Sequence, residues 1–130
     1  MSKRRKGREI VLQAIYQYEL GNNNLEDIIQ FKWIHKKIPE DISLFAKEII
    51  IGTINNIDFV DNVINEKLEN WNLNNIAIID KCILRFSIYS LIFQKDIPKN
   101  VIINEAIDIA RKFGNEKSYQ FINGILDAIR

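Results

Sequence analysis

Apolar residues recur along most of this chain at the three- and four-residue spacing of amphipathic helices. The first such stretch places Val11, Ala14, Ile15 and Tyr18 on one face, and a period near 3.6 residues is typical of a helix with one buried side. No stretch alternates with a period of two for long, and no tight hairpin signal joins two strands. The pattern therefore predicts an all-α fold.

Glycine and proline positions divide the pattern into six expected helices. Gly21 and the three asparagines after it end the first. Pro39 and Pro98 suit first helical turns, and Gly114 stands where a C-cap glycine belongs. The expected helices cover approximately residues 4–20, 24–36, 39–69, 76–94, 98–113 and 118–130.

The chain has the size of one compact domain. With 130 residues, of which 47% are hydrophobic, it can bury enough surface for a stable core without disulfides or a metal. Residues 71–75 interrupt the helical pattern and form a natural border. We therefore expect a single domain made of an N-terminal half, about 1–70, and a C-terminal half, about 71–130.

The apolar run at residues 76–93 has the length of a membrane span. Asp80, Lys81 and Arg85 lie inside it, and charged side chains are costly at the centre of a bilayer. We therefore expect a buried central helix and no contact with a membrane. The single cysteine, Cys82, is consistent with a reducing compartment, and we expect a cytoplasmic protein.

The charge of the chain is unevenly distributed. The net charge is only +1, but residues 1–9 contain five basic side chains and one acidic one, which leaves a net −3 on the remainder. The basic residues of this arm are Lys3, Arg4, Arg5, Lys6 and Arg8. Such an arm is typical of a protein that binds a polyanion; a solubilising tail is the alternative, and charge alone does not decide between them.

Tyr16 adds an aromatic ring to the polar face of the first expected helix. A helical projection places it on the same side as Arg5, about three turns further along. Arginines neutralise phosphates and an aromatic ring stacks on an unpaired base, so this combination suits single-stranded RNA. The alternative is a tyrosine whose ring packs while its hydroxyl reaches water.

Lys81, Arg85 and Tyr89 form a polar stripe along the central helix, four residues apart. A mostly buried helix carries charges where they are paired, solvated or used by a partner. Pairing within the chain is the default interpretation, and a partner-facing stripe is the alternative.

Residues that could support catalysis or bind a metal are scarce. His35 is the only histidine and Cys82 the only cysteine, and the five glycines are scattered singly, so zinc sites, cysteine nucleophiles and phosphate-binding loops lack their residues. Asp58 and Asp61 lie one helical turn apart, but two carboxylates on a helix are more often solvated than metal-bound. We expect no enzyme, no metal and no cofactor.

Three blocks of the sequence resemble the NusB transcription antitermination proteins. The first is RRKGREIVLQAIY at 4–16, and the second is DKCILRFSIY at 80–89. The third extends over 98–127 and contains INEA, FG and FINGILD. Their order and spacing cover the whole chain, and the third block is the most specific.

The resemblance implies a function and a set of partners. It implies about seven helices in two small subdomains. It also implies binding to the boxA element of ribosomal RNA transcripts with NusE, a ribosomal small-subunit protein. The complex would act on elongating RNA polymerase, promoting read-through and ribosomal RNA maturation.

Residue by residue, the resemblance assigns two surfaces. The RNA-binding residues would be Lys3, Arg4, Arg5, Lys6, Arg8, Tyr16, Lys117, Ser118 and Phe121. The residues at or near the NusE surface would be Asp80, Lys81 and Arg85. We expect alanine at Arg4, Arg5 and Arg8 to weaken RNA binding and to leave folding intact.

Other features of the sequence leave alternatives open. Gly7 predicts a weakened first helical turn, since glycine costs roughly 1 kcal/mol of helix propensity relative to alanine. An RNA-binding domain attached to some ribosomal RNA cytosine methyltransferases shares the expected fold, but would be followed by a large catalytic domain. A helical adaptor that binds only protein is the alternative of another class. Whether the free protein is a monomer or a homodimer stays open.

Overall fold

The computed structural model describes residues 2–21, 24–69 and 72–129. Within these ranges it contains seven α-helices, one short 3₁₀ helix and no strand, which confirms the all-α expectation. The elements are α1 (Lys3–Glu19), α2 (Leu25–Ile29), α3 (Glu40–Asn55), α4 (Ile57–Lys67), η1 (Leu73–Asn75), α5 (Ile78–Phe93), α6 (Lys99–Phe113) and α7 (Ser118–Asp127). None of the helices in the described ranges is long and apolar enough to cross a membrane.

The second helix is shorter than the expected 24–36. It ends at Ile29, and Phe31 has a φ of 56°, a left-handed conformation that cannot continue an α-helix. Trp33 then folds back, because its indole N–H donates a 2.9 Å hydrogen bond to the carbonyl of Ile28. The stretch from 30 to 39 is therefore a loop that lies between α2 and α3.

The long helix expected over 39–69 is two helices. Asn56 separates α3 from α4 with φ −116° and ψ 24°, and its side-chain amide donates to the carbonyl of Gly52 at 2.7 Å. Asparagine side chains compete in this way with the backbone hydrogen bonds of a helix. The chain can therefore turn without a glycine or a proline.

The remaining helices begin and end within about three residues of the expected positions. Gly114 is the C-cap of α6 as expected, in an extended conformation. Residues 22, 23, 71 and 130, which the sequence assigned to the first loop, the border and the end of the last helix, lie outside the described residues.

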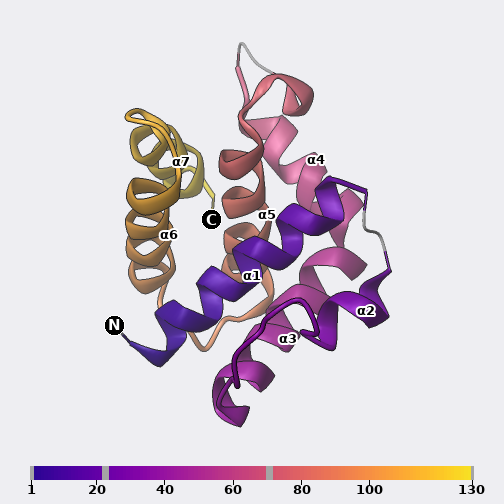
Figure 1. Cartoon of the computed structure of the whole chain (residues 1–130). Helices are drawn as coiled ribbons and strands as arrows, with labels where there is room; N and C mark the ends of the chain where they lie inside the picture. The colour runs from indigo at the N-terminus through magenta and orange to yellow at the C-terminus, as the bar shows by residue number, and fades with distance from the viewer. Residues whose placement is uncertain (1, 22–23, 70–71, 130) are drawn as a thin grey trace.

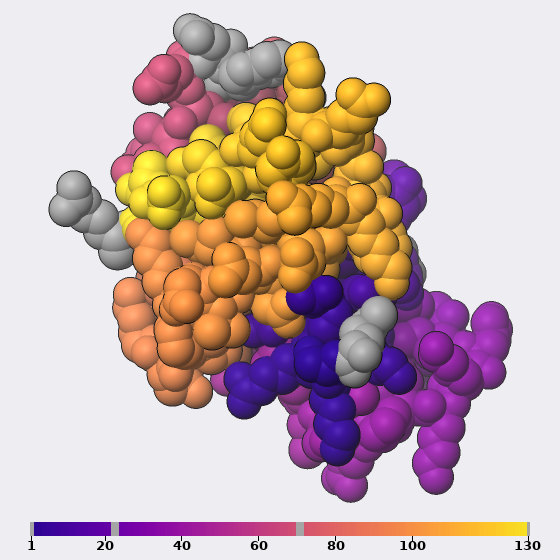
Figure 2. Space-filling model, turned by 90° about the vertical axis from the view of Figure 1, so that its left-hand side faces the viewer, coloured from indigo at the N-terminus to yellow at the C-terminus, as the bar shows by residue number. Residues whose placement is uncertain are grey.

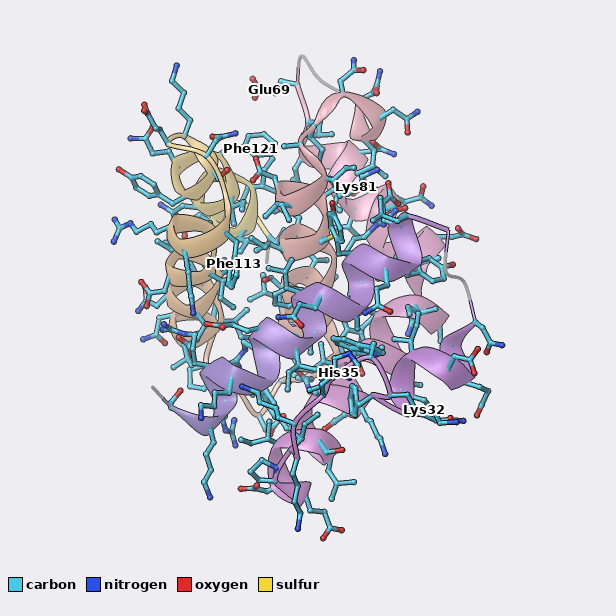
Figure 3. All side chains as sticks on the ribbon, in the orientation of Figure 1. Lys32, His35, Glu69, Lys81, Phe113 and Phe121 are labelled. Carbon is cyan, nitrogen blue, oxygen red and sulfur yellow. The ribbon has the colours of Figure 1, made fainter. Side chains whose placement is uncertain are left out.

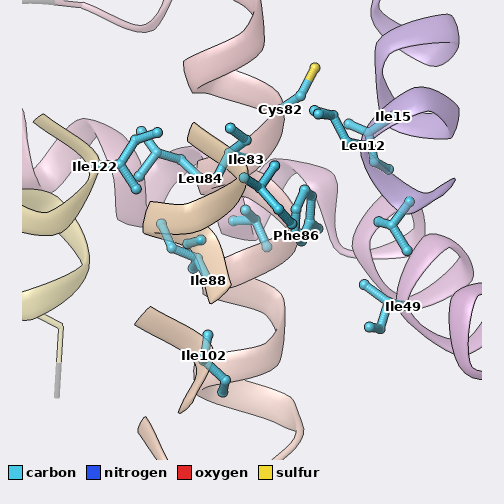
Figure 4. Close-up of a cluster of buried hydrophobic side chains, with 14 of the residues drawn as sticks. Leu12, Ile15, Ile49, Cys82, Ile83, Leu84, Phe86, Ile88, Ile102 and Ile122 are labelled. Atoms are coloured by element: carbon cyan, nitrogen blue, oxygen red, sulfur yellow. The ribbon is translucent and has the colours of Figure 1, made fainter. Parts of the chain in front are cut away.

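Helix α5 is the centre of the molecule. Residues 80–88 are buried without interruption, and α5 packs against α1, α3, α4, α6 and α7. Side chains from these helices form one hydrophobic cluster, part of which is drawn in Figure 4. Because α5 packs against helices on both sides of residue 70, the division into two halves stays a prediction.

Helix α1 lies where the two groups of helices meet. In Figure 1 it crosses in front of α5, with α6 and α7 on one side and α2 to α4 on the other. Its apolar face packs on α3 and α5, while Lys3, Arg4, Lys6 and Gln13 are exposed. The outer face of α1 therefore lies between α2–α4 on one side and α6–α7 on the other.

Candidate nucleic-acid interface

The basic residues at the start of α1 occupy different environments. Ser2 caps the helix by accepting a 3.0 Å hydrogen bond from the backbone N–H of Arg5, so the basic turn is helical. The side chains of Lys3, Arg4 and Lys6 are exposed, that of Arg5 is partly buried, and Arg8 is only 3% exposed. Three of the five predicted cations are thus exposed, and one of these, Lys3, pairs with Asp41 at 3.0 Å.

Arg5 and Arg8 bind acidic side chains of α6. Arg5 donates to Glu105 at 2.8 Å and to Asp108 at 2.7 Å, and Arg8 donates to Glu105 at 3.3 Å. The hydrogen bond to Glu105 raises the pKa of Arg5, whereas burial lowers the pKa of Arg8. Both guanidinium groups therefore connect α1 to α6, and from this contact we expect the replacement of Arg8 to lower stability as well as RNA binding.

Gly7 has a packing role, which the sequence did not predict, in addition to its expected cost in helix propensity. The ring of Phe45 lies so close to α1 that a Cβ on Gly7 would be 2.5 Å from its Cδ2 atom. Arg4 and Arg8 lie over the same ring, at 5.4 and 5.2 Å from its centroid, within the range of a cation–π interaction. The glycine lets Phe45 approach the backbone of α1, which holds the basic turn in place.

Tyr16 lines an aromatic hollow of about 300 Å³, further along α1. Its ring is half-buried against the core, and Trp33 and Phe113 face the same hollow. The residues that line the hollow are Leu12, Gln13, Tyr16, Gln17, Trp33, Ile79 and Phe113. Phe113, labelled in Figure 3, remains 38% exposed. We refer to this feature as the aromatic hollow.

A second hollow, of about 350 Å³, brings together Asp80, Lys117 and Phe121. Phe121 points from α7 towards α5 in Figure 3. Ser118 is buried beside Asp80, and its hydroxyl accepts a hydrogen bond from the backbone N–H of Asn115 at 3.0 Å. We refer to this feature as the acidic hollow.

Asp80 has an unusual environment for a carboxylate. It is 6% exposed, and its Oδ1 atom has no hydrogen-bond partner within the described part of the chain. Burial raises its pKa, and the hydrogen bond from Ser118 opposes that rise. The structure thus places Asp80 beside the predicted RNA-binding residues, away from Lys81 and Arg85.

Lys81 and Arg85 belong to a group of ion pairs in which the cations are buried and the carboxylates are partly exposed. Arg85 donates two 2.9 Å hydrogen bonds to Asp61 of α4 and one of 3.0 Å to Glu19 of α1, and Lys81 pairs with Glu19. We refer to these four residues as the buried network. Burial alone would raise the pKa of Glu19, but the hydrogen bonds from Lys81 and Arg85 lower it. These cations are therefore paired within the chain, and their expected role toward a partner stays a prediction.

Sequence reasoning missed a further group of basic residues. Lys6, Lys36, Lys37 and Lys112 line a groove of about 540 Å³ that runs along the N-terminal half of α1. They come from α1, the loop before α3 and the end of α6. A sequence signal existed, because residues 28–39 contain three lysines and a histidine but no acidic residue.

Comparison with a family model and with curated proteins gives a consistent result. The model of the NusB family matches residues 5–130. The transcription antitermination protein NusB of Treponema denticola is 43% identical over 129 residues, which cover 98% of this chain and 95% of that protein. The protein of the same name from Thermodesulfovibrio yellowstonii is 43% identical over 138 residues, which cover 98% and 91%.

Solved structures agree with this result. T. maritima NusB superposes with a TM-score of 0.85 at 36% identity, over 95% of this chain and 87% of that one. A structure of antitermination factors NusB and NusE in complex with double-stranded RNA superposes with a TM-score of 0.81 over 98% and 96%; at 23% identity it supports the fold alone.

Proposed function

The chain belongs to the NusB family, and from this premise we propose that it is a transcription antitermination factor that binds single-stranded boxA RNA together with NusE. The observation that carries the proposal is the arrangement of the two hollows along one side of the molecule. Ile79 lines the aromatic hollow, and the neighbouring Asp80 lines the acidic hollow. One strand can therefore reach both.

The chemistry of the hollows suits unpaired bases. Aromatic rings offer stacking surfaces that are accessible only to bases free of a duplex. Tyr16, Trp33 and Phe113 supply such rings in one hollow and Phe121 in the other. The unpartnered Oδ1 atom of Asp80 can accept a hydrogen bond from a base amino group, while Lys117 at the rim can meet a phosphate.

The basic residues of α1 divide between two roles in this proposal. Lys3, Arg4 and Lys6 contact phosphates, because they are exposed; for Lys3 the phosphate competes with the exposed Asp41. Arg5 and Arg8 chiefly hold α1 against α6 through Glu105, which orients the exposed cations.

The partner proposals rest on the family. NusE is the protein partner, and the RNA–protein complex acts on the RNA polymerase elongation complex in the cytoplasm. The buried network keeps α1, α4 and α5 in a fixed arrangement that NusE meets, so Lys81 and Arg85 support that surface from within. The NusB family is a family of non-enzymatic antitermination factors, so the proposed function contains no catalytic step.

The test is fluorescence anisotropy with labelled boxA RNA, a scrambled RNA and double-stranded RNA, with and without NusE, at two salt concentrations. We expect a preference for boxA that NusE strengthens and salt weakens. Phe121→Ala removes one stacking surface and weakens boxA binding about tenfold, within the roughly 1–3 kcal/mol of one stacked base.

Phe59→Ala is the matched control. Phe59 is an exposed aromatic residue that contacts Phe93 at the other end of α5, at 5.9 Å between ring centroids, so its loss leaves RNA binding unchanged. Equal binding of the boxA and scrambled RNAs by the unmodified protein would overturn the proposal and favour a protein-binding adaptor.

A further inference from the structure

The groove beside the N-terminal half of α1 has the composition of a phosphate-binding surface. Its rim carries Lys6, Lys36, Lys37 and Lys112, and Glu9 is the single acidic residue that lines it. Isoleucine side chains and Pro39 complete its walls. We call this feature the lysine groove. Figure 2 shows the indigo start of α1 lying between the orange surface of α6 and the purple surface of the α2–α3 part of the chain.

The lysines of the groove are available to a ligand. Lys112 pairs with Glu9 at 3.1 Å, while Lys6, Lys36 and Lys37 make no ion pair with any residue that the structure describes. All three are exposed. Arg5, by contrast, pairs with Glu105 and Asp108, and the buried Arg8 pairs with Glu105 through Nη1, while its Nη2 atom has no hydrogen-bond partner among the described residues. Apart from Arg4, which lies over the Phe45 ring, the basic side chains at this end of α1 that lack an acidic partner among the described residues therefore lie in the groove.

The lysine groove is continuous with the aromatic hollow. Gln13 lines both, and it is exposed on the outer face of α1. Lys6 lies seven residues before Gln13, which is about 10 Å along an α-helix. A strand whose bases stack near Tyr16 can thus continue into the groove without leaving the surface. Figure 3, in which His35 is labelled, shows the α2–α3 loop beside α1 at this point.

We propose that the lysine groove binds the phosphate backbone of the RNA strand where it extends beyond the stacked bases, through Lys6, Lys36 and Lys37. This inference rests on the proposed function, since it requires RNA in the hollows. It assigns sequence-independent affinity to the α2–α3 loop and leaves base preference to the hollows. Backbone contacts of this kind add affinity without reading sequence.

The experiment uses Lys36→Gln/Lys37→Gln in the full chain with NusE. Anisotropy is measured over a range of salt concentrations with two RNAs, one limited to boxA and one extended at both ends. For the extended RNA, we expect about tenfold weaker binding at low salt. We also expect the slope of log affinity against log salt concentration to be smaller in magnitude by about 1.4, because two phosphate contacts are lost and each contributes about 0.7 on a single strand. The ratio of boxA to scrambled affinity stays the same, and the limited RNA is bound as by the unmodified protein.

Lys67→Gln/Lys95→Gln is the matched control, because it removes the same charge from α4 and from the loop after α5. It leaves both the affinity and the salt slope unchanged. An equal loss of affinity in the two variants would mean that only the net charge of the protein matters. This result would overturn the proposal that the lysine groove binds RNA.

Failure of the groove and failure of the proposed function give different results. If the unmodified protein prefers boxA but the Lys36/Lys37 variant keeps its affinity and slope, the groove is wrong and the hollows stand. If that variant instead loses affinity for NusE without RNA, the groove is a protein-binding surface. If the unmodified protein shows no preference for boxA, the proposed function itself fails.

Discussion

The lysine groove and the buried network are both rich in cations, yet their physical states are opposite. In the buried network Arg85 is 5% exposed and held by two carboxylates, and Lys81 is held by one. In the groove Lys6, Lys36 and Lys37 are exposed and lack ion-pair partners among the residues described. Whether a basic residue supports the fold or meets a ligand therefore depends on burial and on nearby acids rather than on residue type.

Helix α1 connects these two regions. Glu19 at its last turn belongs to the buried network, and Lys6 in its second turn borders the groove. Arg5 and Arg8 lie between the two extremes, near the ligand surface but neutralised by α6. A single helix thus carries a structural end and a recognition end, and substitutions along it should separate the two roles.

The largest effect is expected from Arg85→Ala. It leaves Asp61 without the guanidinium that binds both of its oxygens, and removing one partner of a buried pair typically costs about 3–5 kcal/mol of stability. Urea unfolding followed by circular dichroism measures the change. Lys95→Ala, in an exposed loop, should leave the transition midpoint unchanged. A midpoint shared by both variants would mean that the buried network is dispensable.

Arg8→Ala should have an intermediate effect on stability. Arg8 is buried, donates to Glu105 and lies over the Phe45 ring, so truncation removes a charged hydrogen bond and packed methylene groups, together worth roughly 1–3 kcal/mol. Thermal unfolding of Arg8→Ala and Lys6→Ala, each combined with an RNA titration, makes the comparison. Lys6→Ala should keep its melting temperature and weaken RNA binding several-fold. If Lys6→Ala is less stable than Arg8→Ala, the distinction between basic residues that stabilise the fold and basic residues that bind RNA is wrong.

Much of the fold followed from the sequence, and the failures share one cause. Periodicity located α1, α5, α6 and α7, because each buries a continuous apolar stripe. It missed the end of α2 at the left-handed Phe31 and the break at Asn56. Each break depends on the backbone conformation of a single residue. Because the hydrophobic pattern continues on both sides of that residue, periodicity does not detect the break.

The candidate site was predictable only in part. The helical pattern and the resemblance both indicated Tyr16, the resemblance alone supplied Lys117 and Phe121, and each of the three lines a hollow in the structure. Asp80 lies with Ser118 because α5 and α7 pack together, which sequence spacing does not encode. The lysine groove combines residues 6, 36–37 and 112, so no local pattern could reveal it as a single surface.

The smallest effect is expected from Asp80→Asn, and it should have opposite signs for folding and for binding. Burial raises the pKa of Asp80 above that of the unfolded chain, so the native state holds this proton more tightly. The stabilisation from that proton is present at low pH and is lost as pH rises through the folded-state pKa. When Asp80 is ionised, the unmodified protein carries a buried carboxylate with one oxygen unpartnered among the described residues, and a neutral amide relieves a penalty of about 1 kcal/mol.

Urea unfolding at pH 7 and at a pH below 4, together with a boxA titration at pH 7, tests this expectation. Asp80→Asn should be more stable than the unmodified protein at pH 7 and equal to it at the lower pH. It should also bind boxA less tightly, because an amide oxygen is a weaker acceptor for a base amino group than a carboxylate. Asp96→Asn, which changes an exposed carboxylate in the loop after α5, should change neither quantity. A loss of both stability and affinity in Asp80→Asn at pH 7 would show that the carboxylate has a stabilising partner. Asp80 would then stabilise the fold, as the residues of the buried network do, and would not belong to the RNA-binding surface.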